Sequence, residues 1–224
     1  MSSRKFLTRH EIQAMLQSLS EGVHSERNYC LVMMAFIHGL RASELLSLRL
    51  SDLDMGEKIV LITRMKKGFS TVHPLTSDEI KGLRLWLSVR QKIIVQGLHE
   101  DTGWLFISHR GTPLTRQQFY NIIRVTGQRA GLNVDAHPHM LRHACGYALA
   151  NNGIDTRLIQ DYLGHRNIRH TVRYTASSAA RFEGIWRPVT RRGSLHSGPK
   201  CKPPPTVTNI NKTTKKSSLH CLYV

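Results

Sequence analysis

The sequence predicts a mostly α-helical protein with a small β-sheet or hairpin, an α+β fold. Apolar residues recur at helical spacing in most segments of the chain. One stretch is instead rich in β-branched residues, and a second extended run follows it after a glycine-containing turn. The 224 residues suffice for a hydrophobic core in one large domain or two small ones.

Three helices are expected first along the chain. Thr8 and Glu11 have the spacing of a capping box, in which the two residues satisfy backbone amides at a helix start. The helix that they open is expected to run through Leu19. Apolar periodicity predicts a second helix over residues 26–39 and the start of a third over residues 42–48.

The hairpin is expected next. Residues 51–54 form a turn that leads out of the third helix. Residues 58–65 are the β-branched strand, and residues 70–74 return alongside it. Residues 66–68, Lys-Lys-Gly, make the turn between them, where glycine allows a tight backbone. The pattern therefore predicts a hairpin with a basic tip.

The second half of the chain is expected to be helical. Ser77, Asp78 and Glu79 are typical of a helix start, and the apolar face of that helix reaches Ile94. Residues 104–108 predict a short strand or extended run. Further helices are expected over residues 115–130, 138–151 and 156–163, with a short final helix that carries Tyr174.

The composition changes after Trp186, which predicts two regions. Residues 1–187 are expected to form the folded domain, and residues 188–224 a basic tail rich in Pro, Ser and Thr. The tail holds no Asp or Glu, and low hydrophobicity combined with like charge predicts disorder. Such a tail either adds non-specific affinity for phosphate backbones or has no role.

The charge of the chain points to a polyanionic partner. The formal net charge is +17 and the pI is about 10.3. Nucleic acid is the first candidate and a membrane surface the second. We expect no transmembrane helix and no signal peptide, because the apolar runs are too short. Reduced, cytosolic thiols are expected, since no CxxC pair occurs among the cysteines at 30, 145, 201 and 221.

Basic residues at two turns could bind phosphate. Arg41 lies at a helix start, where Glu44 could hold its guanidinium, although a purely local Arg–Glu pair would look the same. Lys67 lies at the hairpin tip, from which a flexible ammonium could reach into a cleft. Lys66 is adjacent, and spacing alone does not decide between the two lysines or exclude a solvated tip.

His139 and Arg142 are spaced to lie on one helix face. An arginine can clamp a phosphate while a histidine moves a proton. A zinc site at His137, His139 and His143 is disfavoured, because no carboxylate or cysteine accompanies them at metal-ligand spacing. Each histidine could also be an ordinary core or surface residue.

His165 and Tyr174 form the last candidate pair. Gly164 is expected to end the preceding helix and to leave His165 at a loop mouth. Tyrosine is a poor nucleophile at its usual pKa of about 10, and nearby cations favour the reactive phenolate. The basic surroundings of Tyr174 therefore suit a nucleophile, although an amphipathic tyrosine at the edge of the core stays open.

The order of these residues resembles the catalytic domain of the tyrosine recombinases, the phage integrase family. The resemblance covers about residues 6–186, and the run HPHMLRHACG…DTRLIQDYLGHRNIRHTVRYTAS is similar to the fimbrial phase-switch recombinases, which invert a promoter segment. It implies the catalytic-domain fold. The extra N-terminal core-binding domain of most members is expected to be absent, as only about 40 residues precede the first arginine. The residues that match the family pattern are Arg41, Lys67, His139, Arg142, His165 and Tyr174.

The resemblance implies a role for each residue. Tyr174 would attack a DNA phosphate to form a 3′-phosphotyrosine bond. Arg41 and Arg142 would hold the phosphate oxygens, with a hydrogen bond from His165. Lys67, or Lys66, would protonate the leaving 5′-oxygen. His139 would help to remove the tyrosine proton.

The resemblance also implies the partners. They are double-stranded DNA with inverted-repeat sites, further copies of the chain in a synaptic tetramer, and accessory DNA-bending proteins. No metal or other cofactor is expected, because the covalent bond stores the energy of the cleaved one. A non-catalytic DNA-binding regulator and a type IB-like DNA-relaxing enzyme stay open as alternatives. Residues expected to contact DNA are Lys66, Arg116, Gln117, Tyr120, Arg166, Arg169 and Arg173.

Overall fold

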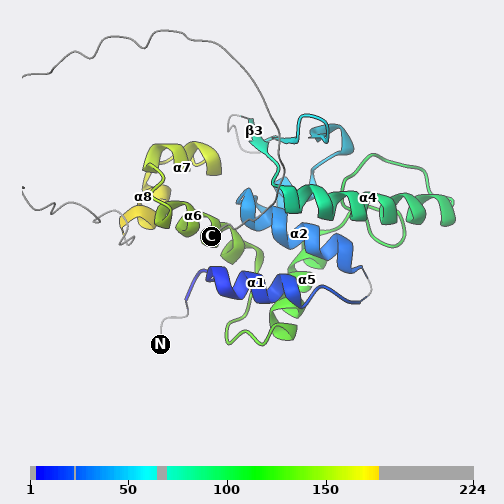
Figure 1. Cartoon of the computed structure of the whole chain (residues 1–224), viewed down its shortest axis with the longest axis horizontal. Helices are drawn as coiled ribbons and strands as arrows, with labels where there is room; N and C mark the ends of the chain where they lie inside the picture. Colours follow the sequence, from blue (N-terminus) through cyan, green and yellow to red (C-terminus); the bar gives the residue numbers. More distant parts are fainter. Residues whose placement is uncertain (1–3, 23, 65–69, 177–224) are drawn as a thin grey trace, which may run out of the picture. The chain divides into compact units, whose positions relative to one another are not determined.

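A computed structural model of the chain describes residues 4–22, 24–64 and 70–176 (Figure 1). Over these residues the fold is mostly helical with one small antiparallel sheet, as the sequence predicts. The expected boundary between residues 1–187 and 188–224 lies outside the described residues. The described helices are α1 (Arg9–Gln17), α2 (Ser25–Ile37), α3 (Ala42–Leu46), α4 (Ser77–Gln96), α5 (Arg116–Arg129), α6 (Pro138–Asn151), α7 (Thr156–Leu163) and α8 (Arg169–Ala176), with a 3₁₀ turn at Leu50–Asp52.

Local signals in the sequence explain where the helices begin and end. The expected capping box at α1 is confirmed: the Glu11 amide donates to the Thr8 hydroxyl, and the Thr8 amide donates to the Glu11 carboxylate. Thr76 caps α4 in the same way, one residue before the predicted start. Helix α2 ends earlier than expected, because Gly39 adopts a left-handed φ of 57° that breaks the helical hydrogen-bond pattern.

The small sheet holds the predicted hairpin and one strand that the sequence did not predict. Its strands are β1 (Leu53–Asp54), β2 (Ile59–Ile62) and β3 (Thr71–Pro74), antiparallel in the order β1-β2-β3. Ile62 pairs with Thr71 across the hairpin. The expected turn at residues 51–54 is partly wrong, because Leu53 and Asp54 pair with β2. The hairpin tip, which carries Lys66 and Lys67, lies outside the described residues.

The strand considered for residues 104–108 does not form. Trp104 and Ile107 each make only an isolated bridge, to Arg49 and Pro113 respectively. The segment is nevertheless buried, with Leu105 and Ile107 fully inside the core. Its apolar pattern therefore reflects burial of an extended segment and not membership of the sheet.

Helix α2 forms the centre of the core, and α6 links the core to the predicted site. Leu31, Val32 and Met34 of α2 are fully buried, and α2 packs against both α4 and α6. Figure 1 shows α2 (blue) alongside α4 (teal). Helix α6 also packs against α7 and α8. Helix α6 therefore connects α2 in the core to α7, which His165 follows, and to α8, which carries Tyr174.

The described part of the chain has two free cysteines, Cys30 and Cys145, and both are buried. Burial raises the pKa of each thiol to about 12, so both are unreactive at neutral pH. Among the helices of the described residues, none is both long and apolar enough to cross a bilayer.

Candidate active site

A buried carboxylate organises the first arginine of the site. Glu44 lies in α3 and is 2% exposed. Its Oε2 accepts a hydrogen bond from the backbone N–H of Arg41 at 2.9 Å. Its Oε1 accepts a second hydrogen bond, from Nη1 of the Arg41 side chain, at 2.5 Å. The predicted Arg41–Glu44 pair is therefore confirmed. Glu44 therefore orients the Arg41 guanidinium. Because the Arg41 side chain stays 31% exposed, this oriented guanidinium is still open to a ligand.

Two further guanidiniums lie against the same carboxylate. Arg64, just after β2, donates from Nη1 to Glu44 Oε2 at 2.9 Å, and Arg142 Nη1 lies 3.8 Å from that oxygen. Burial alone would raise the pKa of Glu44, but the Arg41 amide and the three guanidiniums together hold it below its ordinary value. One negative charge thus faces three positive charges. The remaining positive charge favours an anion in the adjacent space.

Arg142 also ties together the walls of the site. It lies in α6, is 5% exposed, and donates from Nη1 to the Gly39 carbonyl and from Nη2 to the Leu163 carbonyl. Burial lowers its pKa to about 10, which leaves the guanidinium charged at neutral pH. Arg142 therefore connects the ends of α2 and α7 and contributes a fixed positive charge behind the cleft.

A cleft of about 220 Å³ opens beside this cluster. Among the described residues that line it, none carries a carboxylate. A lining of cations, histidines and an amide suits a phosphate group. The lining residues are Arg41, Arg64, Gly164, His165, Arg166, Asn167 and His170.

His165 lies at the cleft, as the sequence predicts. Gly164 ends α7 with a φ of 63°, and the left-handed turn brings His165 to the cleft wall. Its Nδ1 lies 2.9 Å from the Thr171 hydroxyl. Burial, reinforced by the charges of Arg142 and Arg41, lowers the pKa of His165 to about 3. The ring is therefore neutral at pH 7 and can interact with a phosphate oxygen by hydrogen bond.

Tyr174 is packed inside the site and not exposed at its mouth. The residue lies in α8 and is 1% exposed. Its ring stacks against His165 with centroids 6.2 Å apart and meets Tyr147 edge-on at 5.1 Å. Gly146 lies so close that a Cβ there would come within 2.6 Å of the Tyr174 ring. The tyrosine therefore has a fixed pocket, built by α6 and α8.

The nearby cations act on Tyr174 as expected, but burial outweighs them in this conformation. Burial raises the pKa of Tyr174, and the opposing charges of Arg142 and Arg173 do not cancel that effect. The sequence shows how many cations lie nearby but not how deeply the phenol is buried.

His139 and His143 are placed differently from what their positions in the sequence suggest. His139 is exposed at the first turn of α6, with its ring 6.4 Å from that of His137. Arg142 points into the protein, so the two members of the His-x-x-Arg pair differ strongly in burial. His143, considered above only as a disfavoured metal ligand, has its Nδ1 2.9 Å from the Tyr174 hydroxyl. Its spacing of four residues from His139 placed it on the same helix face, but no local signal showed its contact with Tyr174, 31 residues away.

The other predicted residues fall into three groups. Lys66 and Lys67 lie outside the described residues, so both lysine assignments stay predictions. The predicted DNA-contacting residues of α5 are exposed but do not line the cleft; they are Arg116, Gln117 and Tyr120. The three basic residues near α8 are exposed, and only the first lines the cleft; they are Arg166, Arg169 and Arg173. Arg64 and His170, by contrast, line the cleft but were not selected from the sequence.

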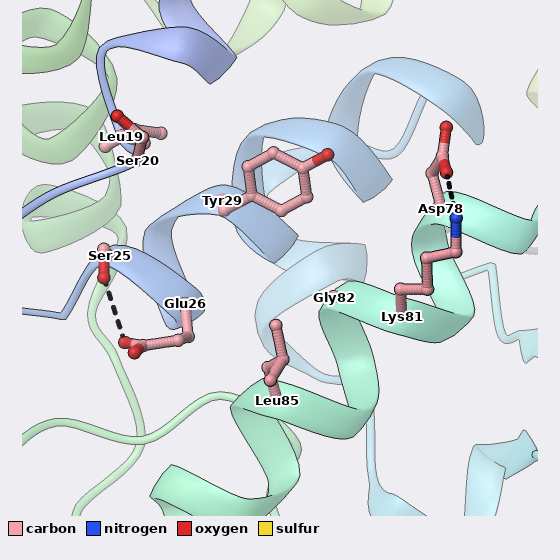
Figure 2. Close-up of a pocket in the computed structure, with 9 residues that line it drawn as sticks. All are labelled: Leu19, Ser20, Ser25, Glu26, Tyr29, Asp78, Lys81, Gly82 and Leu85. Carbon is pink, nitrogen blue, oxygen red and sulfur yellow. Dashed lines mark hydrogen bonds and ion pairs between the residues drawn. The ribbon is translucent and has the colours of Figure 1, made fainter.

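A second hollow, of about 320 Å³, lies between α2 and α4 (Figure 2). Figure 2 shows Tyr29 and Leu85 beside it, with a hydrogen bond between Ser25 and Glu26 and an ion pair between Lys81 and Asp78. Its two carboxylates would repel a phosphate. The smaller cleft near Arg41 is therefore the better candidate for phosphate chemistry, despite its size.

Known proteins share this fold and much of this sequence. The model of the phage integrase family matches residues 5–181. The type 1 fimbriae regulatory protein FimB of Escherichia coli (strain K12) is 58% identical over 183 residues, which are 82% of this chain and 90% of FimB. The corresponding protein FimE is 56% identical over 186 residues, 83% of this chain and 92% of FimE.

A solved structure extends the similarity to three dimensions. The XerH site-specific recombinase, bound to a palindromic difH substrate in a post-cleavage complex, superimposes with a TM-score of 0.68 at 26% identity. The match covers 80% of this chain and 51% of XerH, so this chain spans about half of that protein.

Proposed function

The chain belongs to the phage integrase family and is a tyrosine-type site-specific DNA recombinase, and we propose that it inverts a DNA segment between inverted repeats. The segment that best fits the relatives is the promoter region of a fimbrial operon, since both FimB and FimE are fimbriae regulatory proteins. Residues 1–187 form the catalytic domain under this proposal, and residues 188–224 a basic tail that adds affinity for DNA.

One observation carries the proposal. A cleft whose described lining residues include Arg41 and His165 and hold no carboxylate lies next to Tyr174. The Tyr174 ring packs on His165, and its hydroxyl contacts His143. The three components are a phosphate-binding surface, a nucleophile and a proton-transfer group. Phosphoryl transfer needs these three and little else from a protein.

The reaction begins at Tyr174. Its oxygen attacks the scissile phosphorus while the O–H bond breaks, and the bond from phosphorus to the 5′-oxygen breaks as the 3′-phosphotyrosine bond forms. Arg41 and Arg142 stabilise the negative charge on the non-bridging oxygens. His165 binds one of these oxygens by hydrogen bond. Attack by a 5′-hydroxyl from the partner strand reverses the step and releases the tyrosine.

The two remaining groups of the proposed site handle protons. Lys67, with Lys66 as the alternative, protonates the leaving 5′-oxygen. His139, at the exposed start of α6, helps to remove the proton of Tyr174. No cofactor is needed, because the phosphotyrosine bond keeps the energy of the cleaved phosphodiester bond.

The burial of Tyr174 adds a condition to this mechanism. A phenol that is 1% exposed cannot meet a phosphate unless α8 or its neighbours shift when DNA binds. Arg142, whose Nη1 and Nη2 both donate to carbonyls, acts in this conformation through its charge and through the walls that it holds. We therefore assign the described conformation to the enzyme before cleavage.

Double-stranded DNA is the partner, and assembly on it is part of the proposal. Two recombining sites imply four copies of the chain, with accessory DNA-bending proteins bringing the sites together in the bacterial cytoplasm. Binding should weaken steeply with salt, because each phosphate contact releases counterions. The basic residues proposed to contact DNA are Lys66, Arg116, Gln117, Tyr120, Arg166, Arg169 and Arg173.

An inversion assay tests the proposal against its alternatives. The purified protein is incubated with a supercoiled plasmid that carries the inverted repeats from beside its own gene, and orientation is read by restriction digestion. Inversion that requires both repeats is expected. Relaxation of a plasmid without repeats would instead indicate a type IB-like enzyme. Specific binding with neither reaction would indicate a non-catalytic regulator.

A further inference from the structure

We propose that His143 is a further catalytic residue, which accepts the proton that Tyr174 loses during attack. The inference rests on the proposed function, since it concerns the nucleophile of that reaction. His143 lies in α6, one turn after His139, and faces α8. Its Nδ1 is 2.9 Å from the Tyr174 hydroxyl, and the two ring centroids are 5.9 Å apart. A general base must be within this distance of the proton that it removes.

The protonation state of His143 agrees with the role of an acceptor. Burial lowers its pKa to about 4, and the charges of Arg173, His139, Arg142 and His137 act in the same direction. The imidazole is therefore neutral at pH 7. Because the Tyr174 pKa is raised, the phenol keeps its proton and donates it to Nδ1. The hydrogen of the neutral ring is then on Nε2.

Three other histidines near the site are less well placed for this step. His170 lines the cleft, but it is exposed and its ring meets that of His165 edge-on. His165 stacks on the face of the Tyr174 ring, with an interplanar angle of 22°, and its Nδ1 is engaged with the Thr171 hydroxyl. His139 is exposed at the first turn of α6 and has His137 as its aromatic neighbour. His143 is thus the histidine whose ring nitrogen already meets the oxygen that reacts.

DNA binding would make His143 a stronger base. A base with a pKa of about 4 cannot hold the proton of a phenol on its own. Burial is the largest cause of this low pKa, and the charges of Arg173, His139, Arg142 and His137 add to it. A DNA phosphate bound beside these groups would offset the cationic part. A bound phosphate therefore raises the basicity of His143.

The proton transfer balances within the step. The O–H bond of Tyr174 breaks as an N–H bond forms at His143 Nδ1, and the freed electron pair forms the new O–P bond. The leaving 5′-oxygen takes its proton from the separate acid of the proposed mechanism. When the partner strand attacks, His143 returns its proton to the departing phenolate.

The test measures covalent-adduct formation under single-turnover conditions on a nicked DNA substrate that traps the adduct. His143→Asn keeps an acceptor atom near the position of Nδ1 but cannot take up a proton. Its adduct rate at pH 7 should fall at least about 100-fold, a typical contribution of a general base, while DNA affinity stays within about twofold. The rate should then rise steadily with pH, because solvent hydroxide replaces the missing base.

Two further measurements separate a proton-transfer role from a structural one. His143→Ala should recover adduct formation when free imidazole is added, whereas His139→Ala should not. A substrate with sulfur as the bridging 5′ leaving atom needs no leaving-group acid, so the defect of His143→Asn should persist on it. Restoration of the rate on the sulfur substrate, or no response to imidazole, would overturn the assignment of His143 as the base.

The outcome also distinguishes this inference from the proposed function. If the unaltered chain forms no adduct, the proposed function fails. If it forms the adduct and His143→Asn forms it at the same rate, only the role of His143 fails.

Discussion

Two buried carboxylates occupy the same local position in different regions of this molecule. Glu44 follows the start of α3 and Glu79 the start of α4, each three residues after the residue that precedes its helix. Each accepts the backbone amide of that residue at 2.9 Å, from Arg41 and Thr76 respectively. Both are almost fully buried, at 2% and 1% exposure. The backbone motif alone does not distinguish them.

Their surroundings differ in charge. Glu44 faces the guanidiniums of Arg41, Arg64 and Arg142, which leave an excess of positive charge at the cleft. His38 Nε2 lies 2.8 Å from Glu79 Oε1, and the other ring nitrogen of His38, Nδ1, lies 3.3 Å from His73 Nδ1. One carboxylate therefore organises an anion site, and the other completes a buried polar cluster. The chemistry of each region depends on the neighbours that the fold supplies.

The largest expected effect separates the two carboxylates directly. Glu44→Gln removes the charge that aligns the arginines, so the rate of covalent-adduct formation should fall about 100-fold, comparable to losing a transition-state contact. Stability should also fall by about 3 kcal/mol, since three cations lose their buried partner. Single-turnover cleavage and urea denaturation measure the two quantities.

Glu79→Gln is the matched control. It should lower the free energy of unfolding by about 1–3 kcal/mol, while the folded protein cleaves DNA within about threefold of the original rate. Equal catalytic losses in both variants would remove the distinction between the two regions.

A second pair of substitutions compares two helix glycines. A Cβ at Gly146 would lie 2.6 Å from the Tyr174 ring, whereas one at Gly82 would lie 3.2 Å from the Tyr29 ring. Gly146→Ala should displace the nucleophile and slow adduct formation by about 10–100-fold, because small misplacements of reacting atoms are costly. Gly82→Ala should leave cleavage unchanged and alter stability by no more than about 1 kcal/mol. A fully active Gly146→Ala would show that the pocket of Tyr174 is not needed for the reaction.

A further expected effect concerns pH and the cluster around Glu79. Burial, with the charges of His38 and Arg64, lowers the pKa of His73 to about 3. An unfolded histidine titrates near 6.5, so between pH 6.5 and about 3 the unfolded chain binds a proton that folded His73 does not. Stability is therefore complete above pH 6.5 and is lost as the pH falls through that window.

His73→Gln should reduce the slope of the unfolding free energy against pH in this window by up to about 1.4 kcal/mol per pH unit, the contribution of one proton. Urea denaturation midpoints between pH 7 and pH 4 provide the measurement. His143 and His165 contribute in the same direction, because their pKa values are also lowered. The loss should therefore shrink but not vanish. An unchanged slope would mean that His73 is protonated in the folded protein.

The sequence predicted most helices because their signals are local. The bounds of α6 and α7 match the prediction, with a proline in the first turn of α6 and Gly164 ending α7. Strand β1 was missed because two residues form a strand only through pairing with β2. The segment at residues 104–108 was ambiguous because its continuous apolar run reports burial, which a loop in the core can also have.

The site was predictable where its contacts are local and unpredictable where they are distant. Arg41 and Glu44 are three residues apart, and their pair was expected. Arg64 reaches the same carboxylate from 20 residues away, and His143 reaches Tyr174 across 31 residues. Neither contact follows from spacing. The raised pKa of Tyr174 was missed for the same reason, since burial is a tertiary property.

The most direct test of the central claim is to identify the residue that becomes linked to DNA. The protein is reacted with a labelled, nicked recombination site, separated on a denaturing gel, digested and analysed by mass spectrometry. A 3′-phosphate link on Tyr174 is expected, with no adduct from Tyr174→Phe at unchanged DNA affinity and a normal adduct from Tyr162→Phe. A link on another residue, or an adduct that persists in Tyr174→Phe, would contradict the account.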